Sequence, residues 1–239
     1  MMMFKFEAEQ KIFDIGGVKF GGQPGEVPTV LIGSMFYFGQ KNIDLDERTG
    51  SFNKEKAEDI IKEQETLSYI TGNPGLVEVV GATDEAMMNQ VDFVADVTDL
   101  PFMISSEVAS ALIAGTKHVA EIGVQDKVIY NSIPTGGAQA LKTIKDSQVD
   151  AAILLARNPQ KETSEGKVEI VERIMKLADR AGVGKPIIDV ASFAFGVKMG
   201  AAARAIYDIK NVYGYPVGIG SGNVTTTCDW ARTKFDKDV

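Results

Sequence analysis

Short apolar runs alternate with longer amphipathic segments along almost the whole chain. Residues 29–36 form an apolar run of strand length, and residues 54–70 follow with apolar side chains at helical spacing. The same alternation then recurs, and near-continuous apolar strands are typical of a parallel sheet buried on both faces. The expected strands are residues 29–36, 76–80, 102–105, 128–132, 151–156, 186–190 and 217–220.

The segments between these runs carry helix start and stop signals. Thr83 precedes two acidic residues, which indicates that a helix begins there and runs to about Ala95. Gly123 and Gly182 each follow an amphipathic segment, where glycine commonly ends a helix. The expected helices are residues 54–70, 83–95, 107–122, 136–145, 168–181, 201–212 and 225–235.

This repeat of strand and helix fits two α/β architectures, a doubly wound open sheet and a (β/α)8 TIM barrel. The even rhythm and the lack of a composition break favour one barrel domain over residues 1–239. Within residues 1–26, two short runs flank Gly16 and Gly17, which predicts a hairpin that closes the bottom of the barrel. The chain ends where an eighth strand should begin, so we expect a truncated barrel that lacks its last βα unit. The two unpaired sheet edges would favour a homodimer.

Composition excludes several classes of function. The formal net charge of -8 argues against a nucleic-acid partner. One cysteine and one histidine leave no basis for a metal site, a disulfide framework or a Ser-His-Asp triad. We expect a cytoplasmic protein without direct membrane insertion, because no apolar run approaches the length of a membrane span and no signal peptide begins the chain.

Barrel active sites lie at the carboxyl ends of the strands, where this chain carries Glu78, Ser105, Asn131, Asp189 and Asn223. Amides and carboxylates that interrupt apolar strands cost stability unless each finds a partner. A pterin edge, with its alternating donors and acceptors, supplies such partners.

Each of these residues also has a structural interpretation. Asp189 could cap the following loop, and Asn131 could be a turn residue before a proline. Glu78 could point into the barrel as a structural group, and Asn223 could support left-handed backbone in a glycine-rich stretch. That stretch, residues 218–222, could alternatively bind phosphate, as in a barrel lyase.

Six stretches resemble the H subunit of tetrahydromethanopterin S-methyltransferase. They are FDIGGVKFGGQPGE (13–26), PTVLIGSMFY (28–37), VDFVADVTDLPF (91–102), KHVAEIG (117–123), YNSI (130–133) and AARAIY (202–207). Bacterial relatives of that family move methyl groups between methylcobalamin and tetrahydrofolate. The resemblance implies a pterin-binding barrel that transfers a methyl group between N5 of a methyl-tetrahydropterin, tetrahydromethanopterin or tetrahydrofolate, and the cob(I)amide of a corrinoid protein. Other subunits of a membrane-bound complex are further implied partners, which would place the protein at the periphery of that complex.

The resemblance also implies roles for individual residues. Asn131 matches a pterin-contacting asparagine, Asp189 a pterin-anchoring aspartate, and Asn223 an asparagine that serves near N5. These assignments make Asp189 and Asn223 the catalytic pair. Glu78 stands where related chains carry an acidic residue on the second strand.

Ser105 departs from the family pattern, because related chains carry an aspartate there. A serine cannot anchor a pterin amine as an ion would. This loss and the missing eighth strand motivate an alternative function, a non-catalytic paralogue that acts as an assembly or binding subunit.

Overall fold

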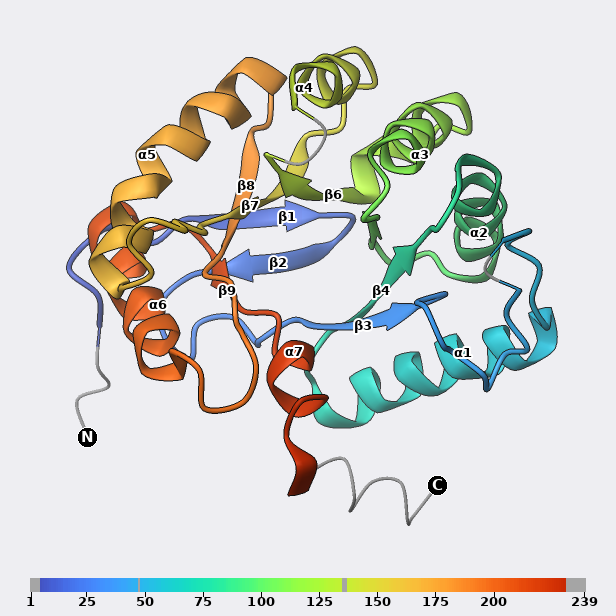
Figure 1. The fold of residues 1–239 in the computed structure, drawn as a ribbon, viewed down its shortest axis with the longest axis horizontal. Helices are drawn as coiled ribbons and strands as arrows, with labels where there is room; N and C mark the ends of the chain where they lie inside the picture. The colour runs from blue at the N-terminus through green and yellow to red at the C-terminus, as the bar shows by residue number, and fades with distance from the viewer. Residues whose placement is uncertain (1–4, 47, 135–136, 231–239) are drawn as a thin grey trace.

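The computed structural model describes residues 5–46, 48–134 and 137–230 (Figure 1). Seven parallel strands form one curled sheet in chain order, with helices around its outside and a separate two-stranded hairpin within. This arrangement confirms the predicted α/β barrel that stops short of closure. The sheet strands are β3 (Leu31–Met35), β4 (Gly75–Val80), β5 (Phe102–Ser105), β6 (Val128–Ile133), β7 (Ala151–Leu155), β8 (Lys185–Asp189) and β9 (Val217–Gly218).

The predicted hairpin consists of β1 (Ile12–Ile15) and β2 (Val18–Gly21), joined by Gly16 and Gly17, which both have positive φ. Its turn lies against Pro101 and Lys127, which precede β5 and β6. The hairpin therefore closes the barrel at the amino ends of the strands. Its buried side chains pack with the inward-facing apolar side chains of the sheet, namely Ile15, Val18 and Phe20 with Leu76, Met103, Ile129, Ala151, Ile153 and Ile187.

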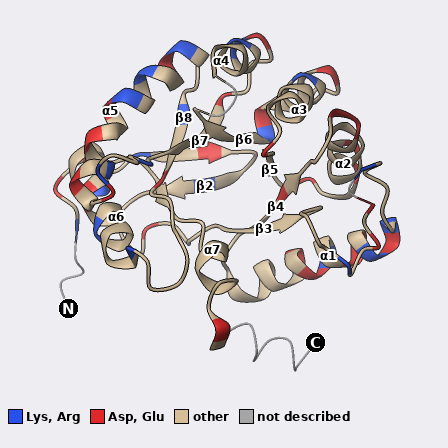
Figure 2. Ribbon diagram, viewed as in Figure 1, with Lys and Arg blue, Asp and Glu red and all other residues tan. Residues whose placement is uncertain are grey.

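The helices cover the outer face of the sheet and form the larger core with it. Thr83 caps α2 as predicted, since its hydroxyl accepts from the Ala86 N–H at 3.1 Å. Charged residues gather on the helices, α5 and α1 above all (Figure 2). The helices are α1 (Lys54–Thr71), α2 (Asp84–Val97), α3 (Ala109–Glu121), α4 (Gly137–Asp146), α5 (Ser164–Ala181), α6 (Met199–Tyr213) and α7 (Gly222–Thr225).

The last expected helix, residues 225–235, is interrupted in the structure: residues 226–228 are not helical, whereas residues 229 and 230 are. The helix α7 is one turn long and ends at Thr225, where the prediction began. The hydroxyls of Thr225, Thr226 and Thr227 donate to backbone carbonyls one turn back, a pattern that weakens helix extension. Residues 231–235 of that prediction lie outside the described residues.

The sheet has two edges, β3 and β9, and within the described residues no strand pairs with the outer side of either. Leu31 and Ile32 on β3 are consequently exposed. An open edge of this kind offers unpaired backbone groups to another strand. Among the helices described, none has both the length and the apolar character that a membrane span requires.

Candidate functional site

The inward-facing side chains change from apolar to polar toward the carboxyl ends of the strands. Leu76, Met103 and Ile129 lie in the apolar interior beside the hairpin. Two positions further along the same strands stand Glu78, Ser105 and Asn131. Because side chains two apart share a face of a strand, all of these project into the barrel. Parallel register pairs Ser34 with Glu78, Ser105 with Asn131, and Leu155 with Asp189, so the polar positions meet at one end.

Three of the predicted site residues form one hydrogen-bonded group. The Asn131 side-chain amide donates to Glu78 Oε1 at 2.9 Å and to Ser105 Oγ at 3.3 Å. The Ser34 hydroxyl donates to the other carboxylate oxygen of Glu78. These side chains come from four adjacent strands, β3 to β6. Together they present hydrogen-bond donors and acceptors at the open, carboxyl end of the barrel, which we call the mouth.

The other two predicted residues form a second group around Gly220. Asp189 ends β8, and its Oδ1 accepts from the Ala191 N–H at 2.8 Å. A methyl group built on Gly220 would lie 3.7 Å from Asn223 Nδ2 and 4.0 Å from Asp189 Oδ2. The same position lies 3.9 Å from the Ser192 hydroxyl. Asn223 and Asp189 thus both approach Gly220, and Asn223 lies within α7 rather than in the open loop that the glycine pattern indicated.

The electrostatics connect the two groups. Burial raises the pKa of Asp189 above the ordinary value of a carboxyl group, and the Glu78 carboxylate adds to this rise. The pKa of Asp189 is lowered by three other groups, namely the Ala191 N–H, the Lys167 ammonium and the Gly220 N–H. Glu78, Ser105, Asn131 and Asp189 stand at the carboxyl ends of parallel strands of one sheet, and Asn223 approaches Gly220 just after the last strand. All five predicted residues are therefore at one end of the barrel.

Lys167 is a buried residue at this site that the sequence reasoning missed. Its ammonium group donates to the carbonyls of Val190 and, at 3.3 Å, of Ala191. A signal for it exists in the sequence. Lys167 stands at helical spacing from Val171 and Ile174 on the buried face of α5, so its side chain had to enter the interior.

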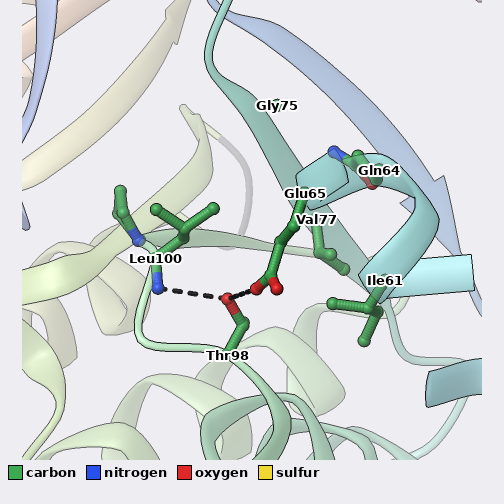
Figure 3. A pocket seen from close by; sticks show the side chains of 8 residues that line it. Ile61, Gln64, Glu65, Gly75, Val77, Thr98 and Leu100 are labelled. Atoms are coloured by element: carbon green, nitrogen blue, oxygen red, sulfur yellow. Dashed lines mark hydrogen bonds between the residues drawn. The ribbon is translucent and has the colours of Figure 1, made fainter. Parts of the chain in front are cut away.

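A small enclosed cavity lies elsewhere, between α1 and the amino ends of β4 and β5 (Figure 3). Its volume of about 10 Å³ is room for about one water molecule. Thr98 Oγ1 donates to Glu65 Oε1 at 2.6 Å and accepts from the Leu100 N–H at 3.1 Å in its wall. The cavity is too small for a heterocycle and is remote from the polar mouth, so it belongs to the packing of the closed end.

Comparison with known proteins identifies the family. Residues 8–239 match the family described as tetrahydromethanopterin S-methyltransferase MtrH subunit. The chain belongs to this family. It is 42% identical to the H subunit of tetrahydromethanopterin S-methyltransferase from Methanothermobacter thermautotrophicus, over 99% of this chain and 78% of that protein. It is also 41% identical to the H subunit from Methanocaldococcus jannaschii, over 96% of this chain and 75% of that protein.

The H subunit from Methanosarcina barkeri is similar to the chain as well, at 39% identity over 98% of this chain and 77% of that protein. The MtrH family is a methyltransferase family, which confirms the class of enzyme that the resemblance implied. All five candidate side chains fall within the residues that match this family, 8–239. The polar mouth is therefore a feature of the region shared with MtrH proteins.

Proposed function

We propose that this member of the MtrH family binds a methyl-tetrahydropterin at the carboxyl ends of its strands and transfers the N5 methyl group to a corrinoid. Tetrahydromethanopterin is the pterin that the names of its relatives indicate, and tetrahydrofolate is the alternative. The observation that carries the proposal is the set of inward-facing amides and carboxylates at the mouth, placed on an otherwise apolar barrel interior. In this proposal, residues 1–239 form a single domain, a pterin-binding barrel.

The residues present fit a pterin. Asn131 offers both a donor and an acceptor, and Glu78 and Asp189 are acceptors for ring and exocyclic N–H groups. Ser105 contributes a hydroxyl beside Asn131 in place of a stronger, charged acceptor. The two groups of side chains would hold the heterocycle from opposite sides of the mouth, which fixes its orientation.

Asp189 and Asn223 are the residues proposed to act on the reacting nitrogen. The tertiary amine is a poor leaving group, and a hydrogen bond or a proton delivered at N5 lowers the barrier. Asn223 Nδ2 is a donor close to Gly220, which the Asp189 carboxylate also approaches. Asp189, whose pKa is raised by burial, holds a proton more readily than an exposed carboxyl group. When the N5–methyl bond breaks, N5 keeps the electron pair of that bond and binds a proton with it, while the methyl acceptor supplies the electron pair of the new bond to carbon.

The corrinoid, held by a partner protein, supplies the methyl acceptor as cob(I)amide. The chain needs no nucleophile of its own for this reaction, which agrees with its single buried cysteine, Cys228. We propose as further partners the other subunits of a methyltransferase complex and a second copy of this chain, paired through the open edges β3 and β9. The working location is then the cytoplasm, at the periphery of a membrane complex.

Isothermal titration calorimetry tests the proposal with methylated and unmethylated forms of both pterins. We expect saturable binding of at least one pterin, and the same affinity for a control variant, Asp59→Ala, on the exposed side of α1. The absence of binding heat with all four ligands would contradict the proposal.

A second candidate is a binding or assembly subunit without turnover. Ser105 favours it, because this chain has a neutral hydroxyl at the position where the family resemblance implies an aspartate. Incubation of the protein with methyl-tetrahydropterin and a reduced corrinoid protein separates the two candidates. Formation of methylcobalamin supports the enzyme, whereas pterin binding without methylcobalamin supports the assembly role. The lyase alternative gains no support from the family match.

A further inference from the structure

Lys167 is a charged side chain inside the protein core. It is 1% exposed, on the face of α5 that packs against the sheet. Lysine is almost never buried without partners, because the removal of an ammonium group from water is costly. The cost is therefore met by specific contacts, which indicate what the residue does.

These contacts are concentrated on the loop that follows Asp189. The ammonium group donates to the Val190 and Ala191 carbonyls, the first two after the carboxylate. The same Ala191 has a positive φ of 53°, unusual for a residue with a side chain, and its N–H donates to Asp189 Oδ1 at 2.8 Å. Lys167 thus holds the peptide units whose N–H group orients the Asp189 carboxylate.

The charges around Lys167 come from several elements. Burial lowers the pKa of Lys167, whereas Asp189 on β8 and Glu162 before α5 raise it. Lys198 before α6 and Arg157 after β7 lower the pKa of Lys167 again. Lys198 forms an ion pair with Glu162, whereas Asp189 lies one residue before the Val190 carbonyl that accepts from Lys167. The centroid of the Phe193 ring lies 5.5 Å from the ammonium nitrogen.

We propose that Lys167 is a positioning residue for the pterin site: it clamps the Val190–Ala191 backbone, which aims the adjacent Asp189 carboxylate into the barrel mouth, and it places a positive charge near that carboxylate. The proposal rests on the proposed function for the part that concerns pterin binding. The coupling between the two side chains is a property of the free protein and can be measured without any ligand.

The first test measures that coupling by NMR in the ligand-free protein. The carboxyl carbon of Asp189 is titrated in the native chain, in Lys167→Met and in Lys167→Arg. We expect Lys167→Met to move the Asp189 titration to higher pH and Lys167→Arg to restore it. Lys176→Met, an exposed lysine of the same helix, is the matched control and leaves the titration unchanged. An unchanged Asp189 titration in Lys167→Met overturns the proposal.

If Lys167→Met does not fold, the same coupling can be measured from the other side chain, because electrostatic coupling is reciprocal. Asp189→Asn keeps the acceptor oxygen for the Ala191 N–H and removes the charge. The Lys167 side-chain carbon next to the ammonium should then titrate at lower pH than in the native chain. An identical Lys167 titration in both proteins overturns the proposal.

The second test adds the pterin. We expect Lys167→Met to weaken pterin binding by about tenfold at pH 7, with the acid limb of the pH–affinity profile moved upward, and Lys167→Arg to recover most of the loss. Weaker binding with an unmoved pH profile would assign Lys167 a merely structural role. A native chain that binds no pterin contradicts the proposed function but leaves the NMR coupling as an independent result.

Discussion

The two ends of the barrel are built from the same strands but serve different purposes. At the amino ends, the hairpin β1–β2 fills the interior with apolar side chains against Leu76, Met103 and Ile129. At the carboxyl ends, two residues further along, the same strands present Glu78, Ser105 and Asn131 to each other and to solvent. The amino end of the barrel therefore contributes stability, whereas the carboxyl end gives up some stability for polar groups that a ligand can use.

The largest expected effect lies at the closed end. Ile129 is fully buried against the hairpin, so Ile129→Ala should reduce the free energy of unfolding by about 2–5 kcal/mol through lost burial and a cavity. Urea denaturation measures the change. Pterin affinity of the folded variant should stay close to native. Leu67→Ala, at an exposed position of α1, is the control and should change stability by about 0.5 kcal/mol or less. If Ile129→Ala reduced the free energy of unfolding by less than Leu67→Ala does, the closed end would not be the main source of stability.

The next effect lies at the open end. Asp189→Ala should weaken pterin binding by about 2–3 kcal/mol, the scale of a hydrogen bond to a charged group. Calorimetric titration of the variant beside the native chain gives the difference in affinity. If the affinity is unchanged, Asp189 is not part of the pterin site.

Ser105→Asp should strengthen pterin binding at the open end. A carboxylate beside Asn131 would offer the pterin a charged acceptor in place of a hydroxyl, and affinity should rise by about 1–2 kcal/mol. Ser105→Ala is the matched variant and should bind no more tightly than the native chain. Weaker binding by Ser105→Asp would mean that position 105 does not face the ligand.

The smallest effect is a gain in stability at the open end. Burial raises the pKa of Asp189 in the folded chain, so the folded state holds this proton more tightly than the unfolded state does. Below the pKa that Asp189 has in the unfolded chain, the protonated carboxyl group makes its full contribution to stability. This contribution is lost as the pH rises through the higher pKa that Asp189 has in the folded chain. At neutral pH the ionised carboxylate is therefore a net cost.

Asp189→Asn removes that cost and should raise stability at pH 7 by about 0.5–2 kcal/mol. The gain over the native chain should shrink as pH falls through the acidic range where Asp189 takes up its proton. Thermal melts of both proteins across this range measure it. A variant that is less stable than the native chain at pH 7 would show that the carboxylate serves stability rather than ligand binding.

Most of the fold could be predicted because apolar runs and caps are local signals. The strand 102–105 has the predicted boundaries, and Thr83 caps its helix as its sequence context indicated. The end of the chain was harder, because the threonine run that limits α7 to one turn acts through side-chain bonds to the backbone. The site residues could be nominated from their places at the strand ends. Their grouping into two clusters depends on strand register, which one sequence does not state.

Lys167 shows the limit of strand-based reasoning for the site. It lies in a helix, and a lysine in an amphipathic helix is ordinarily assigned to the solvated face. Its partners, the Val190 and Ala191 carbonyls, are more than twenty residues away along the chain. Only the packing of α5 against the end of β8 brings them together.

The structure of the protein in complex with a methyl-tetrahydropterin would show directly which end of the barrel binds the pterin. We expect the pterin ring at the carboxyl ends of the strands, with Asn131 and Asp189 each within hydrogen-bond distance of its edge and the methyl group facing outward. A pterin bound at the hairpin end or on the outer helices, with Asn131 and Asp189 still bonded only to their present partners, would mean that the polar mouth is not the pterin site.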